Sequence, residues 1–88
     1  MNENELDSEG EDMESGDDVG ILRIALAEEV QSISQFEEHL VWVDNEEIED
    51  VIESILDCKK DAVARLIKLL VKFDPDQGEK LKNIGLDL

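Results

Sequence analysis

Residues 48–73 read IEDVIESILDCKKDAVARLIKLLVKF, and the spacing of the apolar residues in this stretch decides the fold. They recur at alternating steps of four and three residues, which is the period of a helix face packed in a bundle. One charged residue interrupts the row, which consists of Ile48, Ile52, Ile55, Lys59, Ala62, Leu66, Leu69 and Phe73. The stretch therefore predicts one long amphipathic helix with a lysine on its apolar face.

A second row with the same spacing precedes it and predicts a first helix over about residues 19–43, and this row also contains one charged residue. The row consists of Leu22, Leu26, Glu29, Ile33, Phe36, Leu40 and Val43. A chain reversal at Asp44-Asn45 brings position 29 level with position 59 or 60. A carboxylate and an ammonium on apolar faces are costly unless they are paired. We therefore expect Glu29 and Lys59 to lie opposite each other.

Capping residues set the expected ends of these helices. Asp17 or Asp18 is a suitable N-cap for the first helix. Asp44, with Glu47 three residues later, resembles a capping box and predicts that the second helix begins near position 46. Asp74-Pro75 ends this helix near position 73, because proline disfavours a helical predecessor and lacks the backbone N–H.

Three segments follow from this pattern. Residues 1–18 are acidic and poor in apolar residues, so we expect a disordered leader. Residues 19–75 predict a helical hairpin. Residues 76–88 predict a short helix and a tail, with Gly85 in a C-cap role.

The second helix carries more apolar residues than one neighbour covers. Beside the first row lies a further set, which consists of Val51, Leu56, Val63, Ile67 and Leu70. A hairpin supplies one neighbouring helix, so a second chain is expected to supply the other. A domain of this size also buries little apolar surface alone. The predicted fold is all-α: an antiparallel two-helix hairpin that dimerises into a four-helix bundle, plus a short C-terminal helix.

The composition limits the classes of partner. The chain has 25 acidic and 8 basic residues and a net charge of −17, which argues against direct binding to nucleic acid or to an anionic membrane surface. The N-terminus has no basic segment followed by an apolar one, so no signal peptide is expected. The single cysteine, Cys58, excludes an intramolecular disulfide. We expect a cytoplasmic protein.

Three groups of residues together resemble the encapsulated ferritin-like proteins, short relatives of rubrerythrin. Their first helix reads roughly Ala-Ile-x-x-Glu-x-x-Ala-Ile-x-x-Tyr-Glu, and their second contains Asp-Glu-Glu-Lys-Glu-His before Leu-Leu-x-x-x-Asp-Pro. The matching residues here are Ala25-Leu26, Glu29, Ser32-Ile33 and Phe36-Glu37, then Asp57 to Ala62, then Leu69-Leu70, Asp74-Pro75 and Leu81. The resemblance covers about residues 21–82.

This resemblance implies a hairpin that dimerises, a di-iron ferroxidase centre formed between two chains, ring-shaped assembly and packaging inside an encapsulin shell. Of the three ligand positions only Glu29 is retained. The glutamate position of the second helix is Lys59 and the histidine position is Ala62. The departure indicates that the di-iron site is lost or altered, and we assign no catalytic residue.

Three hypotheses about function follow. In the first, Lys59 replaces the metal by pairing with Glu29, and the protein has a structural, carrier-like or packaged-cargo role. In the second, Glu29 from two chains, with Asp57 or Asp61 turned inward, binds iron or another hard cation. In the third, the acidic leader makes the protein a decoy or regulator of a basic partner protein.

Expectations of less weight concern Cys58, Trp42 and the last five residues. Cys58 is expected to be packed and inert. Trp42 is expected to pack at a chain–chain contact or over the loop. Residues 84–88 weakly resemble encapsulin cargo-loading tails, and a fraying chain end is the alternative.

Overall fold

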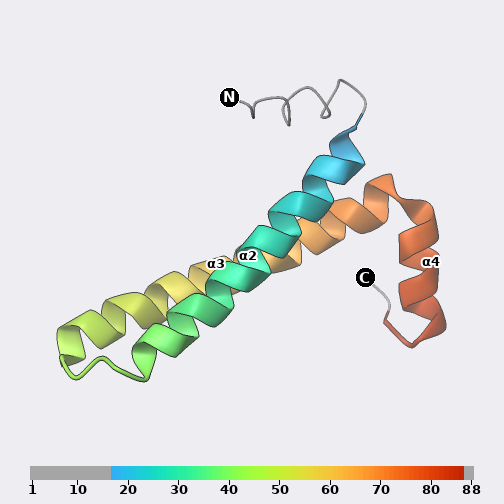
Figure 1. The fold of residues 1–88 in the computed structure, drawn as a ribbon. Coiled ribbons are helices and arrows are strands. Elements are labelled where there is room, and N and C mark those ends of the chain that lie inside the picture. Colours follow the sequence, from blue (N-terminus) through green and yellow to red (C-terminus); the bar gives the residue numbers. More distant parts are fainter. Residues whose placement is uncertain (1–16, 87–88) are drawn as a thin grey trace, which may run out of the picture.

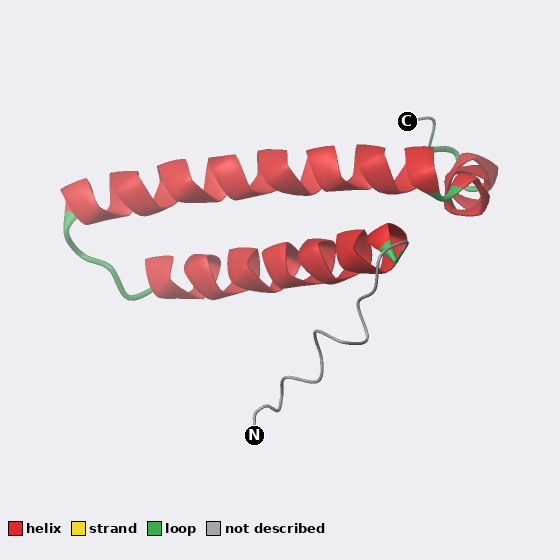
Figure 2. Cartoon of the chain, turned by 90° about the horizontal axis from the view of Figure 1, so that it is seen from above, coloured by secondary structure: helices red, strands yellow, loops and turns green. Residues whose placement is uncertain are grey.

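The computed structural model describes residues 17–86, which form three α-helices and no strand. Helix α2 spans Asp18–Leu40, α3 spans Glu46–Phe73 and α4 spans Pro75–Asn83. Helices α2 and α3 lie side by side with the connection at one end, and α4 turns away at the far end of α3 (Figures 1 and 2). The all-α prediction is confirmed for the described residues.

Parts of the expected segments fall outside this range. Positions 1–16 of the leader predicted at 1–18 lie outside the described residues. Positions 87–88 of the predicted tail also lie outside them. Within the described range, no helix is both long enough and apolar enough to cross a membrane.

The predicted N-cap of the second helix was wrong by one residue. Asn45 occupies that position, and its side-chain oxygen accepts a hydrogen bond from the backbone N–H of Ile48 at 2.9 Å. Asp44 and Asn45 are both good capping residues, so the sequence alone did not separate them. At the start of α2, Asp17 precedes the helix, but its side chain makes no capping hydrogen bond.

Helix α2 ends at Leu40, earlier than the expected position 43. Each of the next three backbone N–H groups bonds to the carbonyl three residues before it, from Val41 to Glu38 at 3.2 Å and from Trp42 to His39 at 3.0 Å. This tighter pattern is usual where an α-helix unwinds at its C-terminus. The apolar row therefore continues into the connection to Val43 without α-helical geometry.

The last helix is fixed at both ends. Asp74 precedes Pro75, and its carboxylate accepts a hydrogen bond from the N–H of Gln77 at 3.4 Å. Gly85 has a φ of 97°, and the N–H of Leu86 bonds to the carbonyl of Leu81 at 2.9 Å. This is a Schellman arrangement with glycine at the left-handed position. The expected C-cap role of Gly85 is confirmed.

The core lies between α2 and α3, and the apolar row of α2 lines it. On α3, however, the most buried residues are Leu56 and Leu70, each 7% exposed, whereas Ile48 and Phe73 are 53% and 57% exposed. The side of α3 that is buried against the rest of the chain carries Ile52, Leu56, Lys59, Val63, Leu66 and Leu70. These residues also step by four and three, and they share three positions with the row predicted first. The periodicity therefore fitted two rows equally well, and the structure places the other one inward.

Candidate functional site

Glu29 on α2 and Lys59 on α3, which the sequence places opposite each other, are in contact. The Lys59 ammonium donates a hydrogen bond to Glu29 Oε1 at 3.1 Å. The two side chains are partly buried, with exposed fractions of 27% for Glu29 and 24% for Lys59. Both residues are in the middle parts of their helices, so the ion pair joins α2 to α3 at the centre of the packed layer.

An aromatic ring adjoins the ion pair. The Lys59 ammonium lies 5.5 Å from the centroid of the Phe36 ring, within the range of a cation–π interaction. The ring of His39 meets the same phenyl edge-on, with centroids 5.8 Å apart. Lys59 therefore has two partners on α2, a carboxylate and an aromatic face, which together fix where its charge lies.

A shallow, open groove borders the ion pair on one side of the helix pair. Glu29, Lys59 and Ala62 line it together with Ser54, Ile55 and Cys58. Cys58 is exposed, so the expectation that it is packed was wrong. The ion pair is thus accessible from this side, and the side chains around it are mainly small or apolar.

The structure does not bring Asp57 or Asp61 to Glu29, as the altered-ligand hypothesis requires. Asp61 forms an ion pair with Arg65 at 2.9 Å, one turn along the same helix, and its side chain is 62% exposed. Asp57 is also exposed. In residues 17–86, no three His, Cys, Asp or Glu side chains gather as a metal site would require.

Iron, which the family resemblance implies, does not fit the residues present in this chain. A di-iron site in a helical bundle takes glutamate and Glu-x-x-His ligands from facing helices. Lys59 offers an ammonium that already donates to Glu29, and Ala62 offers a methyl group. Neither side chain has a lone pair for a metal, so positions 59 and 62 cannot serve as iron ligands.

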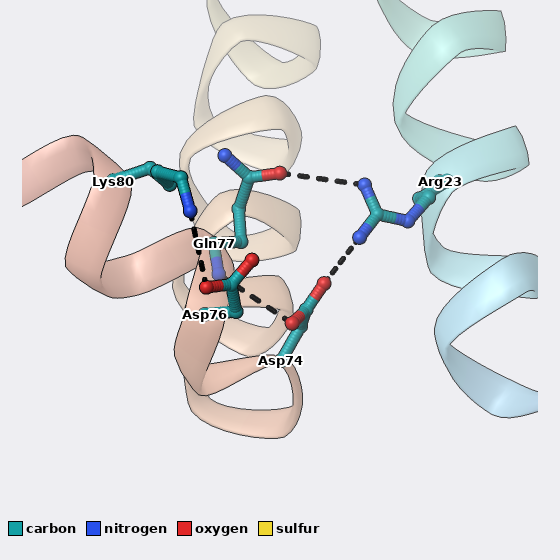
Figure 3. A network of polar contacts seen from close by, with 5 residues as sticks. All are labelled: Arg23, Asp74, Asp76, Gln77 and Lys80. Atoms are coloured by element: carbon teal, nitrogen blue, oxygen red, sulfur yellow. Dashed lines mark hydrogen bonds and ion pairs between the residues drawn. The ribbon is translucent and has the colours of Figure 1, made fainter.

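Sequence reasoning missed a second polar cluster at the corner between α3 and α4 (Figure 3). Arg23 of α2 forms an ion pair with Asp74, and its guanidinium also donates to Gln77 Oε1 at 3.4 Å. A separate pair, Lys80 with Asp76 at 3.2 Å, joins neighbouring turns of α4. The cluster ties the start of α2 to the corner. Arg23 does not belong to the apolar row, so the spacing of the apolar residues could not predict this contact.

Two smaller expectations concern exposed residues. Trp42 is 80% exposed and does not pack over the loop, which leaves the alternative of a chain–chain contact as a prediction. Ile84 and Leu86 of the C-terminal tail are exposed as well.

Comparisons with known proteins returned nothing: this chain matches no protein-family model, no curated protein and no solved structure. The ferritin-like resemblance therefore rests on the residues quoted for it.

Proposed function

We propose that this chain is a structural subunit of the ferritin-like type, without a conventional ferroxidase site. In this proposal α2 and α3 form a helical hairpin that pairs with a second copy to complete a four-helix bundle. The positive charge of Lys59 replaces the metal ion that neutralises the glutamate in the encapsulated ferritin-like proteins. The role left to the protein is structural or carrier-like, or that of cargo packaged in an encapsulin shell.

The observation that carries the proposal is the contact between Lys59 and Glu29. The ammonium lies 3.1 Å from the one retained ligand-type residue and neutralises its charge at the centre of the helix layer. A partly buried carboxylate without a partner is costly, and either a metal or a cation can supply the missing charge. Because the chain provides its own cation, the layer needs no metal to be electrically balanced.

The apolar residues left exposed support the pairing of two copies. Helix α3 buries one row against the rest of the chain and leaves a second set at the surface. Two stacked helices form only a single layer, and stable helical bundles cover both apolar sides of a helix. A second hairpin on the open side gives the four-helix arrangement.

No observation favours the two competing hypotheses. The altered-ligand site needs Asp57 or Asp61 beside Glu29, and Asp61 is held by Arg65 instead. The acidic decoy depends on the leader, of which residues 1–16 lie outside the described range.

Restoring the missing ligands tests the proposal. The double variant Lys59→Glu/Ala62→His supplies carboxylate and imidazole at the two replaced positions. After aerobic Fe(II) loading and desalting, we expect it to retain about one iron per chain and to melt at a higher temperature than without iron. The readouts are elemental analysis and thermal unfolding followed by circular dichroism.

A control makes the same two kinds of substitution, lysine to glutamate and alanine to histidine, at exposed positions that are four residues apart instead of three. Lys60→Glu/Ala64→His introduces the same glutamate and histidine side chains into α3, at two positions that are both exposed. It should retain no more iron than the wild type. Equal iron in the two double variants, or none in either, would contradict the assignment of positions 59 and 62 to a former metal site.

A further inference from the structure

One side of α3 carries an apolar row that is exposed at every position except the half-buried Ala62, and we call it the open stripe. It steps by three and four residues through Ile48, Val51, Ile55, Cys58 and Ala62, is interrupted by the exposed Arg65, and resumes at Leu69 and Phe73. At one end it adjoins Ile21 of α2, which lines a groove together with Leu69 and Phe73. At its centre it adjoins the groove that borders Glu29 and Lys59. The stripe thus runs nearly the full length of the helix.

The charges along α3 divide into two halves. Positions 46–57, the first part of the helix, have six acidic residues and no lysine or arginine. Positions 59–73 have five basic residues and a single acid, Asp61, which is paired with Arg65. The open stripe therefore runs from an acidic half into a basic half.

We infer that the open stripe binds the open stripe of a second copy of this chain in antiparallel orientation, so that the acidic half of each copy lies against the basic half of the other. This inference deepens the proposed structural role and rests on it. A parallel pair would place the two acidic halves side by side, and like charges in such positions are destabilising.

The spacing of the residues agrees with an antiparallel pair. A row of charged residues flanks the stripe, with Glu47 and Asp50 near one end and Lys68 and Lys72 near the other. Antiparallel pairing sets Glu47 against Lys72, Asp50 against Lys68, Ile48 against Phe73 and Val51 against Leu69. These four pairings share one centre, near position 60. Apolar and charged contacts therefore select the same register.

The Glu29–Lys59 ion pair lies close to this centre. Lys59 lies beside the expected two-fold axis, so two Glu29–Lys59 pairs come close together when the copies associate. Association covers the groove on that side and removes these partly exposed charges from water. The ion pair then becomes part of the core of the assembly.

The acidic leader is a poor alternative occupant of the stripe. Its charge suits the basic half of α3, but residues 1–16 include few apolar side chains. An isolated polar segment cannot cover a row of seven positions that are mostly apolar. A second copy of the helix pair, unlike the leader, offers both an apolar stripe and the opposite order of charges.

Distances between spin labels test the orientation in the full chain. Two single-label variants, Asp57→Cys and Glu46→Cys, are made with Cys58→Ala, and both labelled positions are exposed. In the antiparallel pair, the two labels at 57 are offset by roughly 10 Å along the helix axis and the two at 46 by roughly 40 Å. A short distance at both positions indicates a parallel pair and would overturn the inference.

Charge reversal tests the register independently. Glu47→Lys/Asp50→Lys and Lys68→Glu/Lys72→Glu should each weaken self-association at least tenfold in sedimentation equilibrium, and an equimolar mixture should associate again. Lys80→Glu/Lys82→Glu on α4 is the control and should associate like the wild type. A monomer at every concentration, no recovery on mixing, or association that appears only after deletion of residues 1–16 would each overturn the inference. Iron retained by the wild type would instead overturn the proposed function and leave these results standing.

Discussion

Neutralising either member of the Glu29–Lys59 pair should destabilise the fold by an amount set by its burial. Lys59→Met keeps the aliphatic stem near Phe36 and removes the charge, and Glu29→Gln keeps the shape of the carboxylate. Exposed ion pairs contribute about 0.2–1 kcal/mol, whereas removing one partner of a fully buried pair costs about 3–5 kcal/mol. Both side chains are about one quarter exposed, so the values fall between these limits.

We expect Lys59→Met to lower the free energy of unfolding by about 2 kcal/mol and Glu29→Gln by about 1 kcal/mol. The amide still accepts a hydrogen bond from Lys59, whereas the methionine leaves the carboxylate without a cation. For a domain of this size, 1 kcal/mol corresponds to a shift in Tm of about 4–8 °C. The measurement is urea unfolding of the wild type, both single variants and the double variant.

The coupling energy from this double-mutant cycle should be about 1 kcal/mol. The chain contains a matched control, because Lys60 and Glu37 join the same two helices at 3.5 Å with side chains 60% and 52% exposed. The corresponding cycle, with Lys60→Met and Glu37→Gln, should give less than about 0.5 kcal/mol. Equal coupling in the two cycles would refute the argument that burial makes Lys59 and Glu29 a special pair.

Two other predictions concern how the helices are fixed. Asn45→Ala should lower the free energy of unfolding by about 1 kcal/mol because it removes the N-cap of α3, whereas Asp44→Ala should leave it nearly unchanged; equal effects in urea unfolding would contradict the assignment of the cap. Leu56→Ala should cost about 2 kcal/mol and Ile48→Ala less than about 0.5 kcal/mol in dilute protein, because only Leu56 is buried within one chain. The reverse order would show that the row predicted first faces α2.

The sequence predicted the helices well where strong local signals exist. Helix α3 spans 46–73, as expected, because a capping residue precedes it and Asp74-Pro75 stops it. The left-handed Gly85 was expected for a similar local reason. Asn45 was missed because two adjacent residues have the same capping chemistry, and only the backbone conformation selects between them.

The packing was harder to predict than the helices. Ile52, Lys59 and Leu66 belong to both apolar rows of α3, and the choice between the rows depends on how the whole face fits against α2. The opposition of positions 29 and 59 was predictable, since it depends only on where the chain reverses. The contact of Arg23 with Asp74 was not, because it depends on the tertiary position of a corner between two helices.

The iron content of the unmodified full-length protein, after aerobic loading with Fe(II) and desalting, tests the central claim most directly. If Lys59 takes the place of the metal, elemental analysis will find no iron above the level of a protein without a metal site. Iron retained in a fixed ratio to the chain would contradict the claim, because it would show that Glu29 still serves as a ligand in the presence of Lys59.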